Sequence, residues 1–215
     1  MVFGIALLCF SLSVSSSSSA SIVLVTGFEP FMNYTVNPSG VLAEALNGTV
    51  IENSTIIGVV LPVDFNASFA RLMQAIDQYQ PVLLICTGLN AKAHQIRVET
   101  ITYNLMRYQK DDGTWSFPRR IDPSGPFLRP GSLPSYEIMK NIRKENIPVR
   151  ISFFPGTYVC NWVFYQSVGY LASHQLNIRV GFIHVPLFDS QDPDGLSLQQ
   201  MSAALLISIQ TSLVS

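Results

Sequence analysis

The chain of 215 residues has the length of one domain, or at most two small ones. It is 48% hydrophobic and only 13% charged, against a usual charged share of about 25%, and its 13 Lys and Arg nearly balance its 14 Asp and Glu. The lack of a basic surplus argues against a nucleic-acid partner, the apolar content argues against disorder, and three cysteines are too few for a disulfide scaffold.

The first twenty residues carry no charged side chain. The run from Val2 to Val14 is mostly apolar and shorter than the roughly 20 residues that a bilayer span requires. It is typical of a secretory signal, with Ser18 and Ala20 as the small residues of a cleavage site, although a disordered leader or a wrongly chosen start codon remains the alternative.

We therefore expect a signal peptide over residues 1–20 and one α/β domain over residues 21–215, with no membrane span in the mature chain. Four Asn-x-Ser/Thr sites fit a secretory route; they lie at Asn33, Asn47, Asn53 and Asn66. The expected location is outside the cell or in the secretory lumen, or the cytoplasm if the leader is not a signal.

Strands and helices alternate in the first part of the mature chain. Apolar runs, caps and helical stripes predict a strand at 21–26, a helix from Asn37-Pro38 to Gly48, a strand at 55–63, a helix from Asp64 to about Gln78, and a buried strand at 82–86. Residues 94–104 alternate between apolar and polar side chains, which predicts a half-exposed strand.

One long segment interrupts this order. Residues 107–134 are rich in Gly, Pro and charge, which predicts an irregular segment that is functional or forms an interface. The elements then resume with a helix at 135–145, a strand at 149–154, a helix at 158–174, a strand at 180–185 and a helix at 197–213. The alternation predicts an α/β sandwich with a largely parallel sheet.

A cysteine and a histidine fall on the edge of this sheet where ligands collect, the carboxyl ends of the strands. Cys160 lies where a loop turns into a helix, whose free N–H groups favour a thiolate and can hold an oxyanion. His184, near the end of the last strand, can act as base and then as acid for a leaving amine.

The pattern does not choose the third residue that would orient the imidazole. Glu29, Glu99 and Asp189 all remain open as candidates. A cysteine that is only a small buried side chain, and a histidine that is only a satisfied polar group, form the alternative interpretation.

At these residues the sequence resembles the pyroglutamyl peptidase I (pyrrolidone-carboxylate peptidase) family of cysteine peptidases. The resemblance covers residues 22–210 and rests on five segments; they are Thr26-Gly27-Phe28-Glu29-Pro30-Phe31, Asn37-Pro38-Ser39, Leu61-Pro62-Val63, Gly156-Thr157-Tyr158-Val159-Cys160-Asn161 and Gly181-Phe182-Ile183-His184-Val185-Pro186. It implies a three-layer α/β/α sandwich with a mostly parallel twisted sheet. It also implies a triad of Glu99, Cys160 and His184.

The segment around Glu99 departs from the family's pattern. The family has Ser or Thr two residues before the glutamate and Lys or Arg after it, where this chain has Arg97 and Thr100. A glutamine that helps to read the substrate is replaced by Leu89. These departures leave open a weakened homologue that binds blocked peptide N-termini without efficient turnover, or a hydrolase that accepts a different blocked N-terminus.

The resemblance implies a peptide substrate with an N-terminal pyroglutamyl group, a flat and neutral lactam, and neither metal nor cofactor. An apolar pocket with a few placed hydrogen-bonding groups suits such a ring. We expect Phe28, Phe31, Asn37 and Tyr158 to bind it, with core packing of the two phenylalanines as the alternative. No H-E-x-x-H metallopeptidase motif is present. A homo-oligomer is left open.

Overall fold

A computed structural model describes residues 20–215. The predicted signal peptide therefore lies outside the described residues, except for Ala20. The central sheet has the spatial strand order β2 (Val50–Ile51), β3 (Ser54–Leu61), β1 (Ser21–Phe28), β4 (Leu83–Leu89), β9 (Arg179–Val185), β5 (Ile96–Glu99) and β8 (Val149–Ser152). A small separate ribbon pairs β6 (Ile101–Tyr103) with β7 (Leu128–Pro130).

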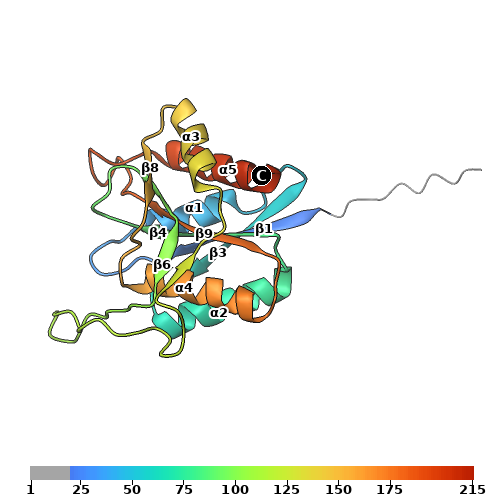
Figure 1. The fold of residues 1–215 in the computed structure, drawn as a ribbon. Coiled ribbons are helices and arrows are strands. Elements are labelled where there is room, and N and C mark those ends of the chain that lie inside the picture. Colours follow the sequence, from blue (N-terminus) through green and yellow to red (C-terminus); the bar gives the residue numbers. More distant parts are fainter. Residues whose placement is uncertain (1–19) are drawn as a thin grey trace, which may run out of the picture.

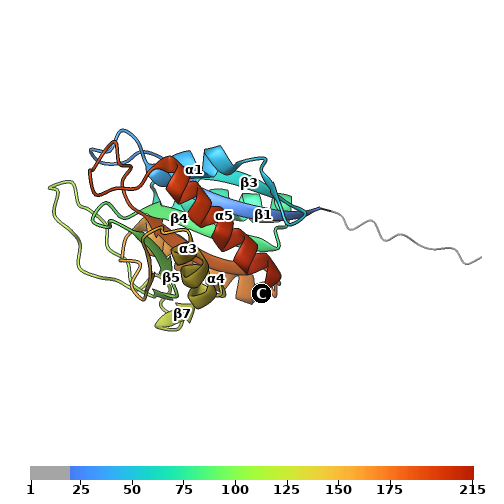
Figure 2. The ribbon, with the colours of Figure 1, turned by 90° about the horizontal axis from the view of Figure 1, so that it is seen from above.

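Helices cover both faces of the sheet. One face carries α1 (Pro38–Leu46), α3 (Ser135–Lys144) and α5 (Leu198–Val214), and the other carries α2 (Phe65–Tyr79) and α4 (Val159–Ser173) (Figures 1 and 2). Each helical layer packs against the sheet around its own apolar core. Ile183 and Val185 of β9 face the layer of α1, α3 and α5, and Val180 and Phe182 face the layer of α2 and α4. This is the three-layer α/β/α sandwich that the sequence predicts.

Local capping signals locate the starts of α1, α2 and α5 correctly. The Asn37 side chain accepts a hydrogen bond from the Ser39 amide and opens α1, with Pro38 at the first helical position. Asp64 caps α2 in the same way, and Ser197 opens α5 with a reciprocal capping box. These signals depend on neighbouring residues, so they can be read from sequence without the rest of the fold.

The prediction of one half-exposed strand over residues 94–104 was wrong. The chain divides at Thr100, so that β5 enters the main sheet while β6 leaves it for the small ribbon. β5 is an interior strand with Ile96, Val98 and Glu99 buried, because β8 covers its outer edge. The alternating pattern predicted extended structure, but it could not show which strands these residues would pair with.

The sheet is mostly parallel with one reversal in its interior. β5 pairs antiparallel with β9 and parallel with β8, while β9, β4, β1 and β3 all run in one direction. The amino end of β5 therefore lies at the same edge as the carboxyl ends of β9, β4, β1 and β3. Of the irregular segment 107–134, only β7 and isolated bridges have regular pairing.

Candidate active site

Two strands and the start of one helix carry the polar side chains of the site. Cys160 is the second residue of α4, His184 is next to last in β9, and Glu99 is the last residue of β5. No side chain caps the amino end of α4, and its first backbone hydrogen bond runs from the Trp162 amide to the Tyr158 carbonyl. The amides ahead of Trp162 lie beyond the reach of intrahelical pairing.

The sheet register brings Glu99 close to His184. In the antiparallel pairing of β5 with β9, Arg97 lies opposite His184 and Glu99 lies opposite Phe182, which makes Glu99 a diagonal neighbour of His184 on one face. The Nδ1 atom of His184 and the Oε1 atom of Glu99 are 2.9 Å apart, and both side chains are at most 5% exposed. Of the three acids that the sequence left open, Glu99 is the one that contacts the imidazole.

Cys160 approaches the same imidazole from the helix. A Cβ atom built on Gly88 would lie only 2.7 Å from the Cys160 sulfur and 2.9 Å from the Phe182 ring. Gly88 is in turn the register partner of His184. The absence of a side chain at Gly88 thus lets the thiol rest against the strand next to His184.

The electrostatics of His184 reflect this placement. Burial disfavours its charged form, but the interactions with Cys160 and Glu99 outweigh burial and raise the pKa of His184 from 6.5 to about 9. Because Nδ1 is committed to Glu99, Nε2 is the nitrogen that faces the thiol. The imidazole therefore holds its proton at neutral pH, between a carboxylate and a sulfur atom.

An apolar pocket opens beside the thiol. Its lining consists of Phe28, Phe31, Asn37, Val63, Leu89, Tyr158, Val159 and Cys160. All four residues that the sequence predicted for ligand binding, Phe28, Phe31, Asn37 and Tyr158, thus line one pocket together with the predicted nucleophile. Their roles in binding remain a prediction.

Asn37 lines the pocket mainly as a structural support. Its Oδ1 accepts hydrogen bonds from the amide and the hydroxyl of Ser39, and its Nδ2 donates to the Glu29 carbonyl. These bonds tie the loop after β1 to the first turn of α1. Asn37 therefore fixes the wall that carries Phe31.

Two further lining residues, Val63 and Leu89, were not among the residues expected to bind the ligand, although the resemblance marks Leu89 as the replacement of a substrate-reading glutamine. Leu89 ends β4 and Val63 lies two residues beyond β3, so the carboxyl-end rule could have found both. Tyr158 is supported by edge-on contacts with Phe65 and Trp115, at ring-centroid distances of 5.5 and 5.3 Å. No local signal in the irregular segment indicated that Trp115 would reach this wall.

The two cysteines of the described chain differ in environment and are not bonded to each other. Cys86 is completely buried in β4, and burial is the main cause that raises its pKa to about 12. Cys160 is partly exposed at the pocket. The thiol of Cys160 is thus free, as a nucleophile requires.

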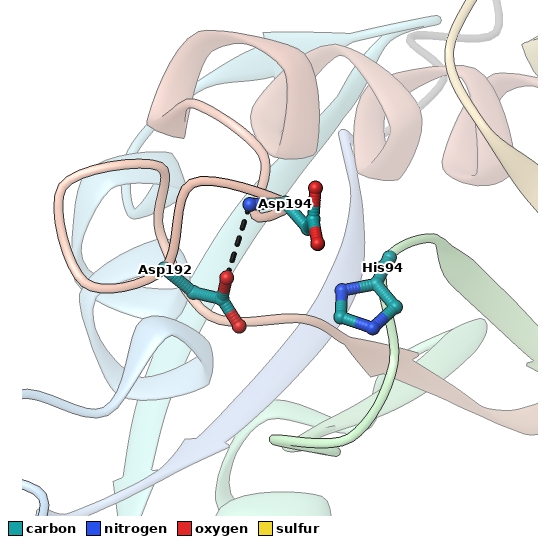
Figure 3. Close-up of side chains that lie close together, drawn as sticks. All are labelled: His94, Asp192 and Asp194. Carbon is teal, nitrogen blue, oxygen red and sulfur yellow. Dashed lines mark hydrogen bonds between the residues drawn. The ribbon is translucent and has the colours of Figure 1, made fainter.

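A second group of polar side chains lies apart from the pocket. His94, Asp192 and Asp194 have ligand atoms within 4.8 Å of one another, and the Asp192 carboxylate accepts a hydrogen bond from the Asp194 amide (Figure 3). His94 and Asp194 are exposed, and Asp192 is half-buried. These three residues are the group in residues 20–215 with the composition to hold a metal ion.

An open α/β sheet with a helix-borne cysteine, a histidine and a carboxylate at the strand ends defines a hydrolase of the thiol peptidase class. The pyroglutamyl peptidase family model matches residues 21–214. The chain belongs to this family.

The relatives match over nearly their whole length. Pyrrolidone-carboxylate peptidase from Bacillus amyloliquefaciens is 36% identical over 198 residues, which are 89% of this chain and 92% of that protein. The crystal structure of pyroglutamyl peptidase I from the same organism superposes with a TM-score of 0.85 at 35% identity, covering 91% of this chain and 96% of the other. The pyrrolidone carboxyl peptidase from Thermococcus litoralis also gives 0.85, at 28% identity, covering 90% and 94%.

Proposed function

We propose that this protein removes an N-terminal pyroglutamyl residue from peptides by covalent thiol catalysis. The observation that carries the proposal is the meeting of Cys160, His184 and Glu99 beside an apolar pocket that opens at the sulfur atom. The names of the relatives, which are pyrrolidone-carboxylate and pyroglutamyl peptidases, supply the class of substrate.

In the first half-reaction the Cys160 thiolate attacks the carbonyl carbon of the pyroglutamyl residue. Free amides at the start of α4 stabilise the oxyanion that forms. The C–N bond then breaks, and the His184 imidazolium gives its proton to the leaving amine. Glu99 holds Nδ1 and so keeps Nε2 directed at the reacting atoms.

In the second half-reaction water attacks the thioester. His184, now neutral, accepts a proton from that water, and the Cys160 thiolate leaves as the C–S bond breaks. Pyroglutamate is released and the imidazolium–thiolate pair is restored. The overall reaction consumes only peptide and water.

The pocket suits a neutral ring. Its walls are aromatic and aliphatic, and none of the lining residues carries a carboxylate that would neutralise a free N-terminal ammonium. Leu89 makes one wall more apolar than the family's glutamine would. The same substitution is the observation behind a second candidate, a hydrolase for another neutral blocked N-terminus.

A fluorogenic pyroglutamyl amide, assayed under reducing conditions, tests the proposal. The wild type should release the amine, and Cys160→Ala should lower kcat/KM by roughly 10³-fold or more. Parallel assays with acetyl-prolyl and free prolyl amides distinguish the second candidate. Comparable turnover by Cys160→Ala would contradict thiol catalysis, and binding of pyroglutamyl peptides without turnover would identify a binding protein.

We also propose that residues 1–20 are a secretory signal, so that the enzyme acts outside the cytoplasm. The uncharged apolar leader supports this proposal, as does the exposure of all four sequon asparagines, Asn33, Asn47, Asn53 and Asn66. No helix within residues 20–215 is long and apolar enough to cross a membrane.

A further inference from the structure

A cationic residue stands beside the catalytic histidine. Arg97 is the register partner of His184 across the antiparallel pairing of β5 with β9. Residues directly opposite each other in such a pair share one face of the sheet, with Cβ atoms about 5 Å apart. The side chain of Arg97 therefore starts on the face of the sheet that carries His184 and Glu99.

Arg97 lies on the side of His184 away from the pocket. The pocket is built from the ends of β1, β3 and β4 and from α4, whereas β5 and β8 continue the sheet in the other direction. His184 lies between the two regions. Because β5 runs against β9, Arg97 lies near the same catalytic edge of the sheet, whereas Glu99 lies deeper.

A second guanidinium lies next to the first. Arg150 of β8 is the register partner of Arg97 in the parallel pairing, and its side chain is exposed. Within residues 20–215 neither arginine forms an ion pair with a carboxylate, and the buried Nε atom of Arg97 has no hydrogen-bond partner. Partial burial, and next the charge of Arg150, lower the pKa of Arg97 below its ordinary value.

The reaction places the leaving peptide next to these charges. The pocket fixes the acyl side of the scissile bond, and the leaving amine must reach His184 to receive its proton. The residue after pyroglutamate therefore departs past the side of His184 that does not face the pocket. An anion on that residue would meet Arg97 and relieve its repulsion with Arg150.

We propose that Arg97, assisted by Arg150, forms a subsite for a carboxylate of the leaving peptide. This inference rests on the proposed peptidase function and specifies its substrates. The carboxylate comes either from an acidic side chain directly after pyroglutamate or from the free C-terminus of a pyroglutamyl dipeptide. The planar guanidinium matches a carboxylate with two parallel hydrogen bonds.

Three substrates of matched size separate the two sources of the carboxylate. They are pyroglutamyl-glutamine amide, which is neutral, pyroglutamyl-glutamate amide, with a side-chain carboxylate, and pyroglutamyl-glutamine with a free C-terminus. We expect the wild type to favour at least one charged substrate by about tenfold in kcat/KM over the neutral one at low salt. The preference should shrink as ionic strength rises.

Variants assign the preference to the two arginines. Arg97→Gln should reduce the ratio of charged to neutral kcat/KM to near one, Arg150→Gln should reduce it partly, and Arg97→Lys should retain part of it. Arg71→Gln removes an exposed arginine on α2 and should leave the ratio unchanged. The ratio is the readout, because Arg97 also interacts with Glu99 and its loss can change the absolute rate.

A binding experiment separates failure of the subsite from failure of the proposed function. Titration calorimetry of Cys160→Ala with the same three peptides should give the same order of affinity without turnover. Equal affinities and equal kcat/KM values in the wild type, or a preference that survives Arg97→Gln together with Arg150→Gln, would overturn the inference. If the wild type cleaves none of the peptides, the proposed function fails while the calorimetric order still decides the subsite.

Discussion

Glu99 shows what the sequence could and could not reveal about single residues. The position of His184 follows from the rule that parallel strands present their carboxyl ends at one edge. Cys160 follows β8, which runs against β9, so the rule does not account for its place beside His184. Glu99 did not follow, and Glu29 and Asp189 stayed equally open on pattern alone. The choice depends on the reversed direction of β5, which sets the diagonal contact with His184 and which hydrophobic alternation does not encode.

Glu99→Gln should change the pH profile as well as the rate. Glu99 helps to raise the pKa of His184 to about 9, so the imidazolium that protonates the leaving amine is lost as pH rises through that value. Without the carboxylate the pKa of His184 falls toward 6.5. The alkaline limb of kcat/KM should therefore move to lower pH, with a decrease of about 10²-fold or more at the optimum.

The measurement is a kcat/KM profile from pH 5 to 10 with a pyroglutamyl amide. Glu29→Gln, at the acid that does not contact His184, is a matched control whose alkaline limb should stay in place. A Glu99→Gln profile with an unmoved alkaline limb would show that Glu99 does not set the protonation of His184.

The start of α4 is the element on which the site depends most, and Asn161 anchors it. The buried Asn161 side chain accepts from the Thr102 hydroxyl and the Tyr103 amide, and it donates to the carbonyls of Tyr103 and Leu105. These bonds join the first turn of α4, next to Cys160, to β6.

Asn161→Ala should destabilise the whole domain. The substitution removes the side-chain partner of the Tyr103 amide and of the Leu105 carbonyl, with a cost of about 1–3 kcal/mol for each unsatisfied group before relaxation and water entry. The Thr102 hydroxyl and the Tyr103 carbonyl each keep a backbone partner. We expect the free energy of unfolding in urea to fall by about 3 kcal/mol.

The exposed Asn177, which follows α4 at a distance from the site, supplies the control. Asn177→Ala should change the free energy of unfolding by no more than about 0.5 kcal/mol. A loss for Asn161→Ala as small as that of the control would mean that the junction of α4 with β6 is held by packing rather than by these hydrogen bonds.

At the scale of elements, the sequence predicted helices better than strand partners. Asn37, Asp64 and Ser197 cap their helices through residues three positions away at most, so each start could be read locally. The two-residue strand β2 was missed because it exists only as the partner of β3. β5 and β6 were merged because their separation depends on contacts with distant residues.

For the whole molecule, alternation of strands with helices was enough to predict an α/β sandwich with a largely parallel sheet, and the family resemblance implied its three layers. Right-handed crossovers leave few ways to arrange such a chain, and the apolar runs of β1 and β4 indicated a buried parallel sheet. The irregular segment 107–134 resisted prediction because its order comes from contacts such as that of Trp115 with Tyr158. Composition alone could not show that this segment lies beside the pocket.

The proposed secretory route is tested on the full-length chain. Expressed in a eukaryotic cell, the protein should appear in the medium with Ser21 as its first residue. Leu8→Arg places a charge in the apolar run and should retain the protein inside the cell. Recovery of an uncleaved wild-type chain from the cytosol would contradict the signal peptide.

The two thiols of the folded domain differ so much in exposure that a thiol label can count the active sites in a preparation. Cys86 is sealed within β4 and holds its proton up to about pH 12, whereas Cys160 opens onto a pocket. An alkylating reagent at neutral pH therefore meets one reactive sulfur per folded domain. The moles of label incorporated measure the concentration of competent sites in any preparation, and a second equivalent taken up on standing reports the fraction that has unfolded.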